Sequence, residues 1–291
     1  VMSDARVGYL QSGFISGRRL DENLFILRYL VEESYRAGSE LVVIAIDFKK
    51  AFDSVDRGAL VRALMYYKCE PRVISAIVEL YRGDCTDIYR EGDYMGQVEV
   101  RRGIRQGCTG SPQMFIMVIG MLIERLLCSG MGYKQDGLYI PVLFYADDGL
   151  LLARSAGEAG RMVEILENIA EEFGLEINKE KSHCLIFNGN GKNQVGDIDV
   201  VDRIKYLGVT VESSRDCFRR SRIERIETAE RLSNITFSVI SRACERMLVG
   251  KTFWKSVVLP RVLSSASIIS WSREEEEKLQ RIENGVWRKI L

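Results

Sequence analysis

Apolar residues recur at helical spacing in the N-terminal part of the chain. In residues 20–34, Leu24, Leu27 and Val31 fall on one face of a helix, and Asp21 is placed to cap its N-terminus. Side chains three, four or seven positions apart align along a helix. The segment is therefore predicted to be a helix with one apolar face.

A second kind of pattern follows, in which apolar residues form short uninterrupted runs. Residues 41–47, LVVIAID, are rich in β-branched side chains, which is typical of a buried strand. Residues 54–67 return to a helical pattern, with Ser54 or Asp56 as the N-cap. Residues 111–127 are apolar on most faces and begin with a Ser-Pro pair, which predicts a buried helix.

The next part of the chain alternates strands and a helix. Residues 139–153, YIPVLFYADDGLLLA, are predicted to form two short strands hinged at Asp147–Asp148–Gly149. Residues 158–174 carry an apolar helical face and end with a glycine, a common residue just past a helix. HCLIF, at 183–187, is a further predicted strand.

Between residues 41 and 187 the predicted order is strand, helices, strand, strand, helix, strand. This is the β-α-β-β-α-β split unit, so the fold class is predicted to be α+β. In such a unit the first strand and the central hairpin can lie side by side. Asp47, at the end of the first strand, would then lie beside Asp147 and Asp148 at the hairpin turn.

The paired aspartates need a compensating charge, because adjacent carboxylates at a half-buried site repel each other and lose hydration. Hard oxygen ligands suit Mg²⁺, and two such ions about 3.5–4 Å apart support phosphoryl transfer. The chain has one histidine, His183, which argues against a zinc enzyme or a histidine-based triad. An ordinary acidic hairpin turn is the alternative interpretation of Asp147 and Asp148.

Composition and charge limit the picture without identifying a partner. Lysine plus arginine and aspartate plus glutamate number 41 each, although local stretches are basic: SGRRL, VRRGIRQG and CFRRSRIER. The seven cysteines show no CxxC spacing, which favours free thiols in a reducing, intracellular compartment. No uninterrupted apolar run approaches 18 residues, so we expect no membrane span and no membrane partner.

Five motifs, in order along the chain, resemble the palm motifs of reverse transcriptases. The closest similarity is to retrotransposons without long terminal repeats, the LINE type, and the N-terminal QSGFISGRRLDENLFI also matches that subgroup. The five motifs are VVIAIDFKKAFDSVD, GIRQGCTGSPQMF, FYADDGLLLA, GLEINKEKSHCLIF and IKYLGVTV. The resemblance implies a right-hand polymerase fold: partial fingers at 1–40, a palm at 41–211, and at 212–291 a helical thumb with the start of a C-terminal connection.

The resemblance assigns the catalytic metal ligands. Asp47, the backbone carbonyl of Phe48, Asp147 and Asp148 match the residues that hold two Mg²⁺ ions in the family, with Mn²⁺ as a substitute. Lys181 matches a lysine placed near the leaving pyrophosphate. Its close competitor is Lys179, and a solvated surface lysine is the alternative. A cation at this position would neutralise or protonate the leaving group.

The resemblance also implies contacts to the nucleotide and the template. Lys50, Ala51 and Phe52 match the backbone segment that cradles the triphosphate, and the ring of Phe52 would clash with a ribose 2′-hydroxyl. A plain core aromatic is the alternative for Phe52. Gln106 and Gly107 match the loop that supports the template and the nascent base pair, because glycine permits close approach and glutamine both donates and accepts.

Contacts to the primer and to the nucleic-acid backbone are implied as well. Tyr206, Leu207 and Gly208 match the hairpin that grips the primer end. Arg18 and Arg19 lie in the remaining fingers segment and would contact template or nucleotide. The thumb offers four arginines for phosphates: Arg219, Arg220, Arg222 and Arg225.

The predicted function is that of an RNA-directed DNA polymerase, with an RNA template, a DNA primer and deoxynucleoside triphosphates as partners. The resemblance also implies a nuclear or ribonucleoprotein location. Two other functions stay open. One is a catalytically incompetent fragment or domesticated palm and thumb that only binds nucleic acid, and the other is an RNA-templated RNA polymerase on the same palm.

Overall fold

The structure is a computed structural model that describes residues 10–135, 137–189, 193–241 and 243–290. The chain divides into two compact units. Unit 1 comprises Val1–Asn23 and Glu33–Val201, and unit 2 comprises Leu24–Glu32 and Asp202–Leu291. The division runs through the first helix. The three-part division into fingers, palm and thumb stays a prediction.

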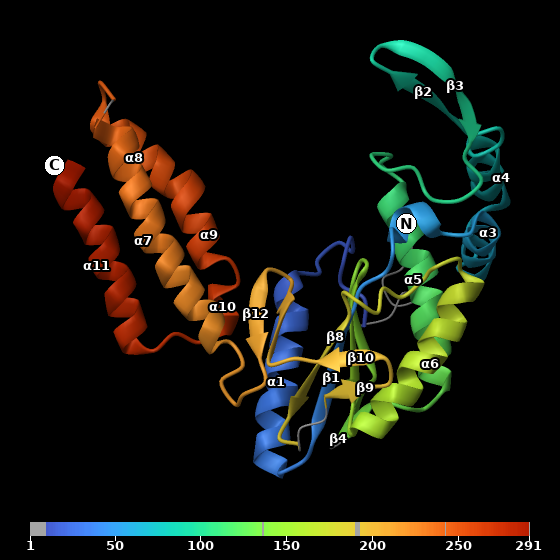
Figure 1. The fold of residues 1–291 in the computed structure, drawn as a ribbon, viewed down its shortest axis with the longest axis horizontal. Coiled ribbons are helices and arrows are strands. Elements are labelled where there is room, and N and C mark those ends of the chain that lie inside the picture. Colours follow the sequence, from blue (N-terminus) through green and yellow to red (C-terminus); the bar gives the residue numbers. More distant parts are fainter. Residues whose placement is uncertain (1–9, 136, 190–192, 242, 291) are drawn as a thin grey trace. The chain divides into compact units, whose positions relative to one another are not determined.

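Unit 1 alternates helices and strands (Figure 1). Its elements, including the whole of the shared α1, are α1 (Leu20–Ala37), β1 (Leu41–Ile46), α2 (Ala51–Ser54), α3 (Arg57–Tyr66), α4 (Pro71–Leu80), β2 (Cys85–Arg90), β3 (Asp93–Glu99), α5 (Ser111–Cys128), β4 (Tyr133–Gln135), β5 (Leu138–Ile140), β6 (Val142–Tyr145), β7 (Asp148–Ala153), α6 (Ala156–Glu172), β8 (His183–Phe187), β9 (Gln194–Val195) and β10 (Ile198–Val200).

The main sheet of unit 1 has the strand order β6-β7-β1-β8-β10-β9. β1 lies between β7 and β8 and pairs with both in the antiparallel sense, with Val43 opposite Leu152 on one side and Leu185 on the other. Leu41 to Ile44 are fully buried, as expected for a central strand. This order confirms the predicted split unit and the α+β fold class.

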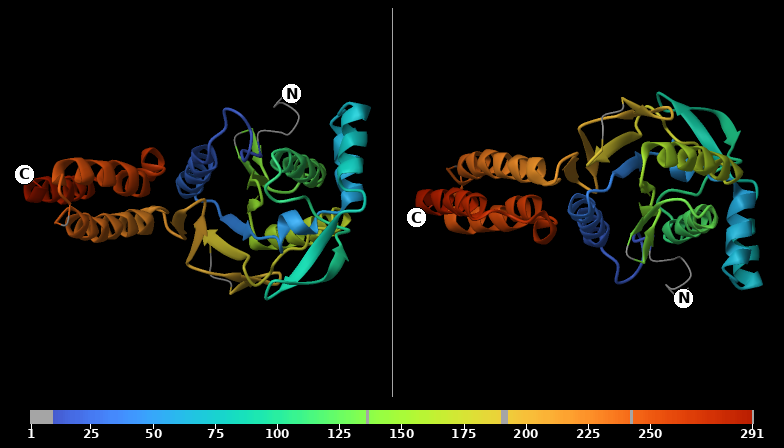
Figure 2. Two further views of the ribbon diagram at one scale, coloured as in Figure 1. Left: turned by 90° about the horizontal axis from the view of Figure 1, so that it is seen from above. Right: turned by 90° about the horizontal axis from the view of Figure 1, so that it is seen from below.

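Two long helices lie together beside this sheet, as the views in Figure 2 also show. α6 packs against β1 and β7, and α5 packs against α6 and α3. By length and composition alone α5 could cross a membrane, but most of it is buried within unit 1, as in an ordinary core helix. The expectation of no membrane span stays a prediction.

The N-cap of α3 agrees with the prediction from the sequence, whereas the N-cap of α1 differs from it. Asp56 caps α3, because its Oδ2 accepts a hydrogen bond from the Ala59 amide at 2.6 Å. Asp21 is not the cap of α1, and that prediction is wrong. Arg19 occupies the N-cap position, and the Glu22 carboxylate accepts a hydrogen bond from its amide. The helix begins earlier, where the Glu22 carboxylate satisfies the Arg19 amide.

The hairpin hinge also differs from the prediction. Tyr145 pairs with Asp148, so the two-residue turn is Ala146–Asp147, and Asp148 already opens β7. Gly149 lies within β7 opposite Phe144, where an added Cβ would approach the Phe144 ring to 2.4 Å. The glycine therefore serves ring packing in a strand and not the turn itself.

Unit 2 contains a short hairpin and a set of helices. These elements are β11 (Arg203–Tyr206), β12 (Val209–Glu212), α7 (Arg219–Ser241), α8 (Arg246–Phe253), a π-helix η1 (Trp254–Val258), α9 (Leu259–Leu263), α10 (Ala266–Ile269) and α11 (Arg273–Ile290). α7 packs against α11, α8 and α9. Their shared core includes Ala229, Leu232, Trp254, Val258, Val262 and Val286.

Two of the four arginines predicted to meet phosphates are instead buried in unit 2. Arg222 forms ion pairs with Asp216 and Glu275 and donates to the Ile269 carbonyl. Arg225 donates to the Val262 carbonyl. Arg222 joins α7 to α10, α11 and the loop before α7, and Arg225 joins α7 to α9, so the prediction of phosphate contacts at Arg222 and Arg225 is wrong. These acidic partners lie up to 53 positions away along the chain, so periodicity could not identify them.

Candidate active site

The pairing of β1 with β7 brings Asp47 to the same end of the sheet as the Asp147–Asp148 turn. Ile46 lies opposite Gly149, so Asp47 and Asp148 are the next residues on the two strands. The backbone of Asp47 is held on both sides. Its amide donates to Ser182 Oγ at 3.1 Å, and its carbonyl accepts from the Asn178 amide at 2.8 Å.

Burial and neighbouring charge both act on the carboxyl group of Asp148. Asp148 is exposed by surface area, yet nearby atoms withdraw its carboxyl group from water. This burial raises the pKa of Asp148, and the charges of Asp147 and then Asp47 raise it further. The charges of Asp47 and Asp147, which lie one hundred positions apart along the chain, therefore both reach Asp148.

Carboxylate oxygens are the ligands that a hard divalent cation prefers, but these carboxylates are not gathered into a metal cage. Among the residues that the structure describes, no group of three or more histidine, cysteine, aspartate or glutamate side chains is arranged to hold a metal ion. Mg²⁺ is usually bound through one or two carboxylates, with waters and substrate phosphates completing its shell. Such an ion would offset the repulsion that the negative charges of Asp147 and Asp47 exert on Asp148.

Phe52 lies in α2, directly after the Asp47 segment, and stacks on an aromatic residue of α5. The ring centroids of Phe52 and Phe115 are 4.2 Å apart with an interplanar angle of 16°. The Phe52 carbonyl accepts from the Ile104 amide at 2.8 Å. Phe52 is only partly buried, whereas Phe115 is fully buried, so Phe115 backs the ring on the core side.

The loop after β3 reaches back to α2. Gly103 lies against Asp53 so closely that a Cβ would come within 2.7 Å of the Asp53 carbonyl oxygen. Gln106 Nε2 then donates to Asp53 Oδ1 at 2.9 Å. Gly107 has φ +83, a conformation that glycine adopts readily. The structure thus brings the predicted template residues Gln106 and Gly107 beside the predicted nucleotide segment.

An unpredicted carboxylate anchors this loop. Asp84 accepts hydrogen bonds from Arg57 at 2.7 Å and from Arg105 at 2.6 Å. The Arg105 hydrogen bond lowers the pKa of Asp84, and Arg57 adds to this against the opposing effect of burial. Arg57 also donates to the Val100 and Gly103 carbonyls. Asp84 could not be identified from the sequence, because its partners come from a distant helix and loop.

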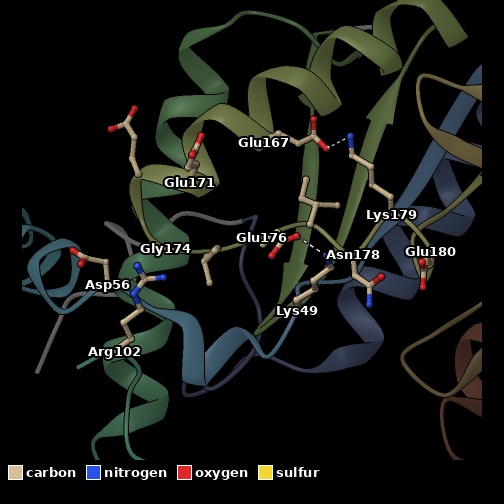
Figure 3. Close-up of a pocket in the computed structure, with 13 residues that line it drawn as sticks. Lys49, Asp56, Arg102, Glu167, Glu171, Gly174, Glu176, Asn178, Lys179 and Glu180 are labelled. Atoms are coloured by element: carbon tan, nitrogen blue, oxygen red, sulfur yellow. Dashed lines mark hydrogen bonds and ion pairs between the residues drawn. The ribbon is translucent and has the colours of Figure 1, made fainter. Parts of the chain in front are cut away.

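The two candidate lysines have different surroundings. Lys179 forms ion pairs with Glu167 at 2.9 Å and Asp197 at 2.8 Å, and Figure 3 shows it pointing toward Glu167. Lys181 is exposed in the same turn, next to Ser182, which binds the Asp47 amide. This separation favours Lys181 as the lysine available to a substrate, and its role stays a prediction.

None of the three aspartates lines the cavity in Figure 3, although Asn178, which binds the Asp47 carbonyl, does. The volume of the cavity is about 1050 Å³. Its lining includes Lys49, which pairs with Glu176, together with further glutamates of α6 and the loop after it. Because neither Asp147 nor Asp148 lines it, we do not assign the active site to this cavity.

The structure also describes the remaining residues that were predicted to contact nucleic acid, and their roles stay predictions. Arg18 forms an ion pair with Glu22 at 2.9 Å, and Arg19 is exposed. In unit 2, β11 and β12 form the predicted hairpin. Its turn consists of Leu207 at φ 47 and Gly208 at φ 76, and Tyr206 is buried at its base.

A comparison with protein families matches residues 2–211 to a family described as reverse transcriptase (RNA-dependent DNA polymerase). A Pol polyprotein from a type-1 retrotransposable element R2 of Nasonia vitripennis is 26% identical over 267 residues, covering 83% of this chain and 26% of that protein. The transposon TX1 149 kDa protein of Xenopus laevis is 29% identical over 213 residues, covering 68% of this chain and 16% of that protein. The chain therefore spans about a quarter or less of these two relatives.

Solved telomerase structures share the fold. The apo telomerase of Candida tropicalis aligns with a TM-score of 0.53 at 13% identity, covering 97% of this chain and 51% of that chain. Telomerase from Candida albicans, in complex with a fragment of telomeric RNA, aligns with a TM-score of 0.51 at 15% identity, covering 96% and 48%. At these identities the likeness concerns the fold alone, and it agrees with the predicted right-hand polymerase architecture.

Proposed function

Because the chain belongs to the reverse transcriptase (RNA-dependent DNA polymerase) family, we propose that it extends a DNA primer with deoxynucleotides on an RNA template. The observation that carries the proposal is the meeting of Asp47 with Asp147 and Asp148 at one end of the sheet. The similarity to R2 and TX1 proteins supports a role within a retrotransposon of the type that lacks long terminal repeats.

In this proposal Asp47, Asp147, Asp148 and the Phe48 carbonyl would hold two divalent cations, Mg²⁺ or Mn²⁺ in its place. When bound, such ions supply positive charge that stabilises the attacking and leaving oxygens of a phosphoryl transfer. The protein's own contribution is to hold the three carboxylates close together. The hydrogen bonds of Asn178 and Ser182 to the Asp47 backbone support that arrangement.

The surrounding residues would select and orient the nucleotide. The backbone at Lys50 and Ala51 would carry the triphosphate, and the Phe52 ring, backed by Phe115, would exclude a 2′-hydroxyl. Gln106 would exchange its bond to Asp53 for one to the nascent base pair. Lys181 would place a positive charge near the leaving pyrophosphate.

The primer and template would be held by further segments. Tyr206, Leu207 and Gly208 would support the primer end, and Arg18 and Arg19 would contact template or nucleotide. Of the thumb arginines, Arg219 remains a candidate for phosphate contact because it is exposed. The cysteines are all free, which supports an intracellular, reducing location, with the nucleus or a ribonucleoprotein particle as the proposed place of action.

Primer extension on an RNA template tests this function. The substitution Asp147→Asn removes one carboxylate charge while keeping side-chain size, and Asp93→Asn, on the exposed β3, is the matched control. We expect Asp147→Asn to lower the extension rate by at least roughly 100-fold, and Asp93→Asn to leave it unchanged. Equal extension by the wild type and Asp147→Asn would refute the proposal.

A further inference from the structure

The N-terminal QSGF segment lies along the free edge of the catalytic hairpin. Gln11 and Phe144 form a parallel bridge. The Phe144 amide donates to the Leu10 carbonyl at 2.7 Å, and the Ser12 amide donates to the Phe144 carbonyl at 3.0 Å. The segment therefore adds one bridge to the free edge of β6, next to the turn that carries Asp147.

Within this segment, the side chain of Gln11 binds the backbone of the turn itself. Its Oε1 accepts from the Ala146 amide at 3.0 Å and from the Gly13 amide at 2.8 Å. Its Nε2 donates to the Ala146 carbonyl at 3.3 Å. One carboxamide thus satisfies both polar groups of the Ala146 backbone, and both residues are buried, with Gln11 fully inaccessible to solvent.

Ala146 needs such support because of its conformation. It has φ +58, in the left-handed region that disfavours residues with a Cβ. It is the first residue of a two-residue hairpin turn, a position where glycine is common. A non-glycine residue keeps such a conformation only when its surroundings enforce it, and such sites cluster in active sites.

The turn is also closely packed from the same side. Gly13 lies so near Ala146 that a Cβ on Gly13 would come within 2.4 Å of the Ala146 nitrogen. A second buried amide, Asn23, donates to the Phe144 carbonyl at 3.1 Å and accepts from Ser12 Oγ at 2.8 Å. Asn23 thus binds the strand two residues before the turn, whereas Gln11 binds the residue that immediately precedes Asp147.

We propose that Gln11 is a positioning residue of the active site: its carboxamide holds Ala146 in the left-handed conformation and thereby fixes the position of the Asp147 carboxylate. The inference rests on the proposed function, which makes Asp147 a metal ligand. Groups that orient a ligand through hydrogen bonds typically contribute 10- to 100-fold, as a rough range, to metal affinity or activity.

Four variants of the full chain separate this role from simple packing. Gln11→Met keeps the length of the side chain and removes its hydrogen bonds. Asn23→Leu makes the same kind of change at the strand and is the matched control. Ala146→Gly removes the need for Gln11 to hold residue 146 at positive φ, because glycine adopts positive φ without a steric cost. The double variant Gln11→Met/Ala146→Gly completes the set.

Three quantities would be measured on each variant. Mn²⁺ affinity, from the electron paramagnetic resonance signal of free Mn²⁺, reports the carboxylates without requiring catalysis. Primer extension gives kcat and the KM for the deoxynucleotide. Urea unfolding midpoints report the general loss of stability that removal of any buried amide produces.

We expect Gln11→Met to weaken Mn²⁺ binding and to lower kcat, each by about 10-fold or more, with the nucleotide KM within about two-fold of the wild type. Asn23→Leu should lower the urea midpoint comparably while leaving Mn²⁺ affinity within about two-fold. Adding Ala146→Gly to Gln11→Met should restore most of the Mn²⁺ affinity.

Other results would overturn the inference. These are equal Mn²⁺ affinity in the wild type and Gln11→Met, equal losses in Gln11→Met and Asn23→Leu, or no recovery with Ala146→Gly. Failure of the proposed function looks different. A wild-type chain that binds Mn²⁺ more tightly than Gln11→Met, yet extends no primer, would refute polymerase activity and support the positioning role of Gln11.

Discussion

At the scale of single residues, the key side chains of the site are held by neighbouring groups. Burial and then the charges of Asp147 and Asp47 raise the pKa of Asp148, and the backbone of Asp47 is hydrogen-bonded on both sides. Phe52 is only partly buried, and its ring leans on the buried Phe115. The contact with Phe115 therefore fixes which face of the Phe52 ring is left exposed. An aromatic residue with a purely structural role in the core would not require an exposed face.

Substitution of Phe52 tests its role in sugar selection. Phe52→Val removes the ring but keeps an apolar, β-branched side chain, so a 2′-hydroxyl would no longer clash. We expect the ratio of kcat/KM for deoxynucleotides to that for ribonucleotides to fall by at least about 10-fold, a typical value for a changed apolar contact. Single-nucleotide insertion kinetics measure the ratio. An unchanged ratio would favour the core-aromatic interpretation.

At the scale of elements, regular patterns were predictable and long-range polar contacts were not. The run 41–47, the helix at 111–127 and the hairpin with YADD followed from periodicity and apolar runs. The β6–β7 turn was placed one residue late, because Asp-Asp-Gly is a common turn sequence whereas the structure uses Ala146 at positive φ. Gln11 gave no signal of its partner, which lies 135 positions away.

The β6–β7 hairpin depends on a glycine that is not in its turn. Gly149→Ala would drive a Cβ into the Phe144 ring, so we expect a loss of about 1–3 kcal/mol in the free energy of unfolding. Gly157→Ala, in the exposed first turn of α6, meets no atom within 4 Å and should raise stability by up to about 1 kcal/mol. Urea titration measures both, and equal effects would contradict the packing argument.

The loop that carries Gln106 should respond to acid through Asp84. The hydrogen bond from Arg105 lowers the folded-state pKa of Asp84 below its ordinary 3.8. Its contribution to stability is then full above pH 3.8 and is lost as pH falls through the lower folded-state pKa. We expect Asp84→Asn to be less stable than the wild type near neutral pH and to show a weaker loss of stability on acidification.

Urea titrations at pH 7 and at several values below pH 4 would measure this difference, with the exposed Asp93→Asn as the control. Parallel pH dependence in the wild type and Asp84→Asn would show that Asp84 does not anchor the loop electrostatically. The comparison matters for function because the same loop places Gln106 beside Asp53.

At the scale of the whole molecule, charge is balanced and is organised locally within each unit. Unit 1 gathers the three aspartates and the nucleotide segment, whereas unit 2 buries Arg222 and Arg225 in its own interior. The proposed nucleic-acid binding would therefore rely on fewer exposed arginines than the sequence indicated. The catalytic claim depends on unit 1 alone, where segments distant in sequence meet at one sheet end.

That meeting can be observed directly by anomalous X-ray diffraction. Crystals of the chain would be grown with Mn²⁺, an RNA template annealed to a DNA primer, and a deoxynucleotide. We predict anomalous peaks in coordination contact with the carboxylates of Asp47, Asp147 and Asp148. An ordered primer and nucleotide with no anomalous density among these three aspartates would contradict the central claim.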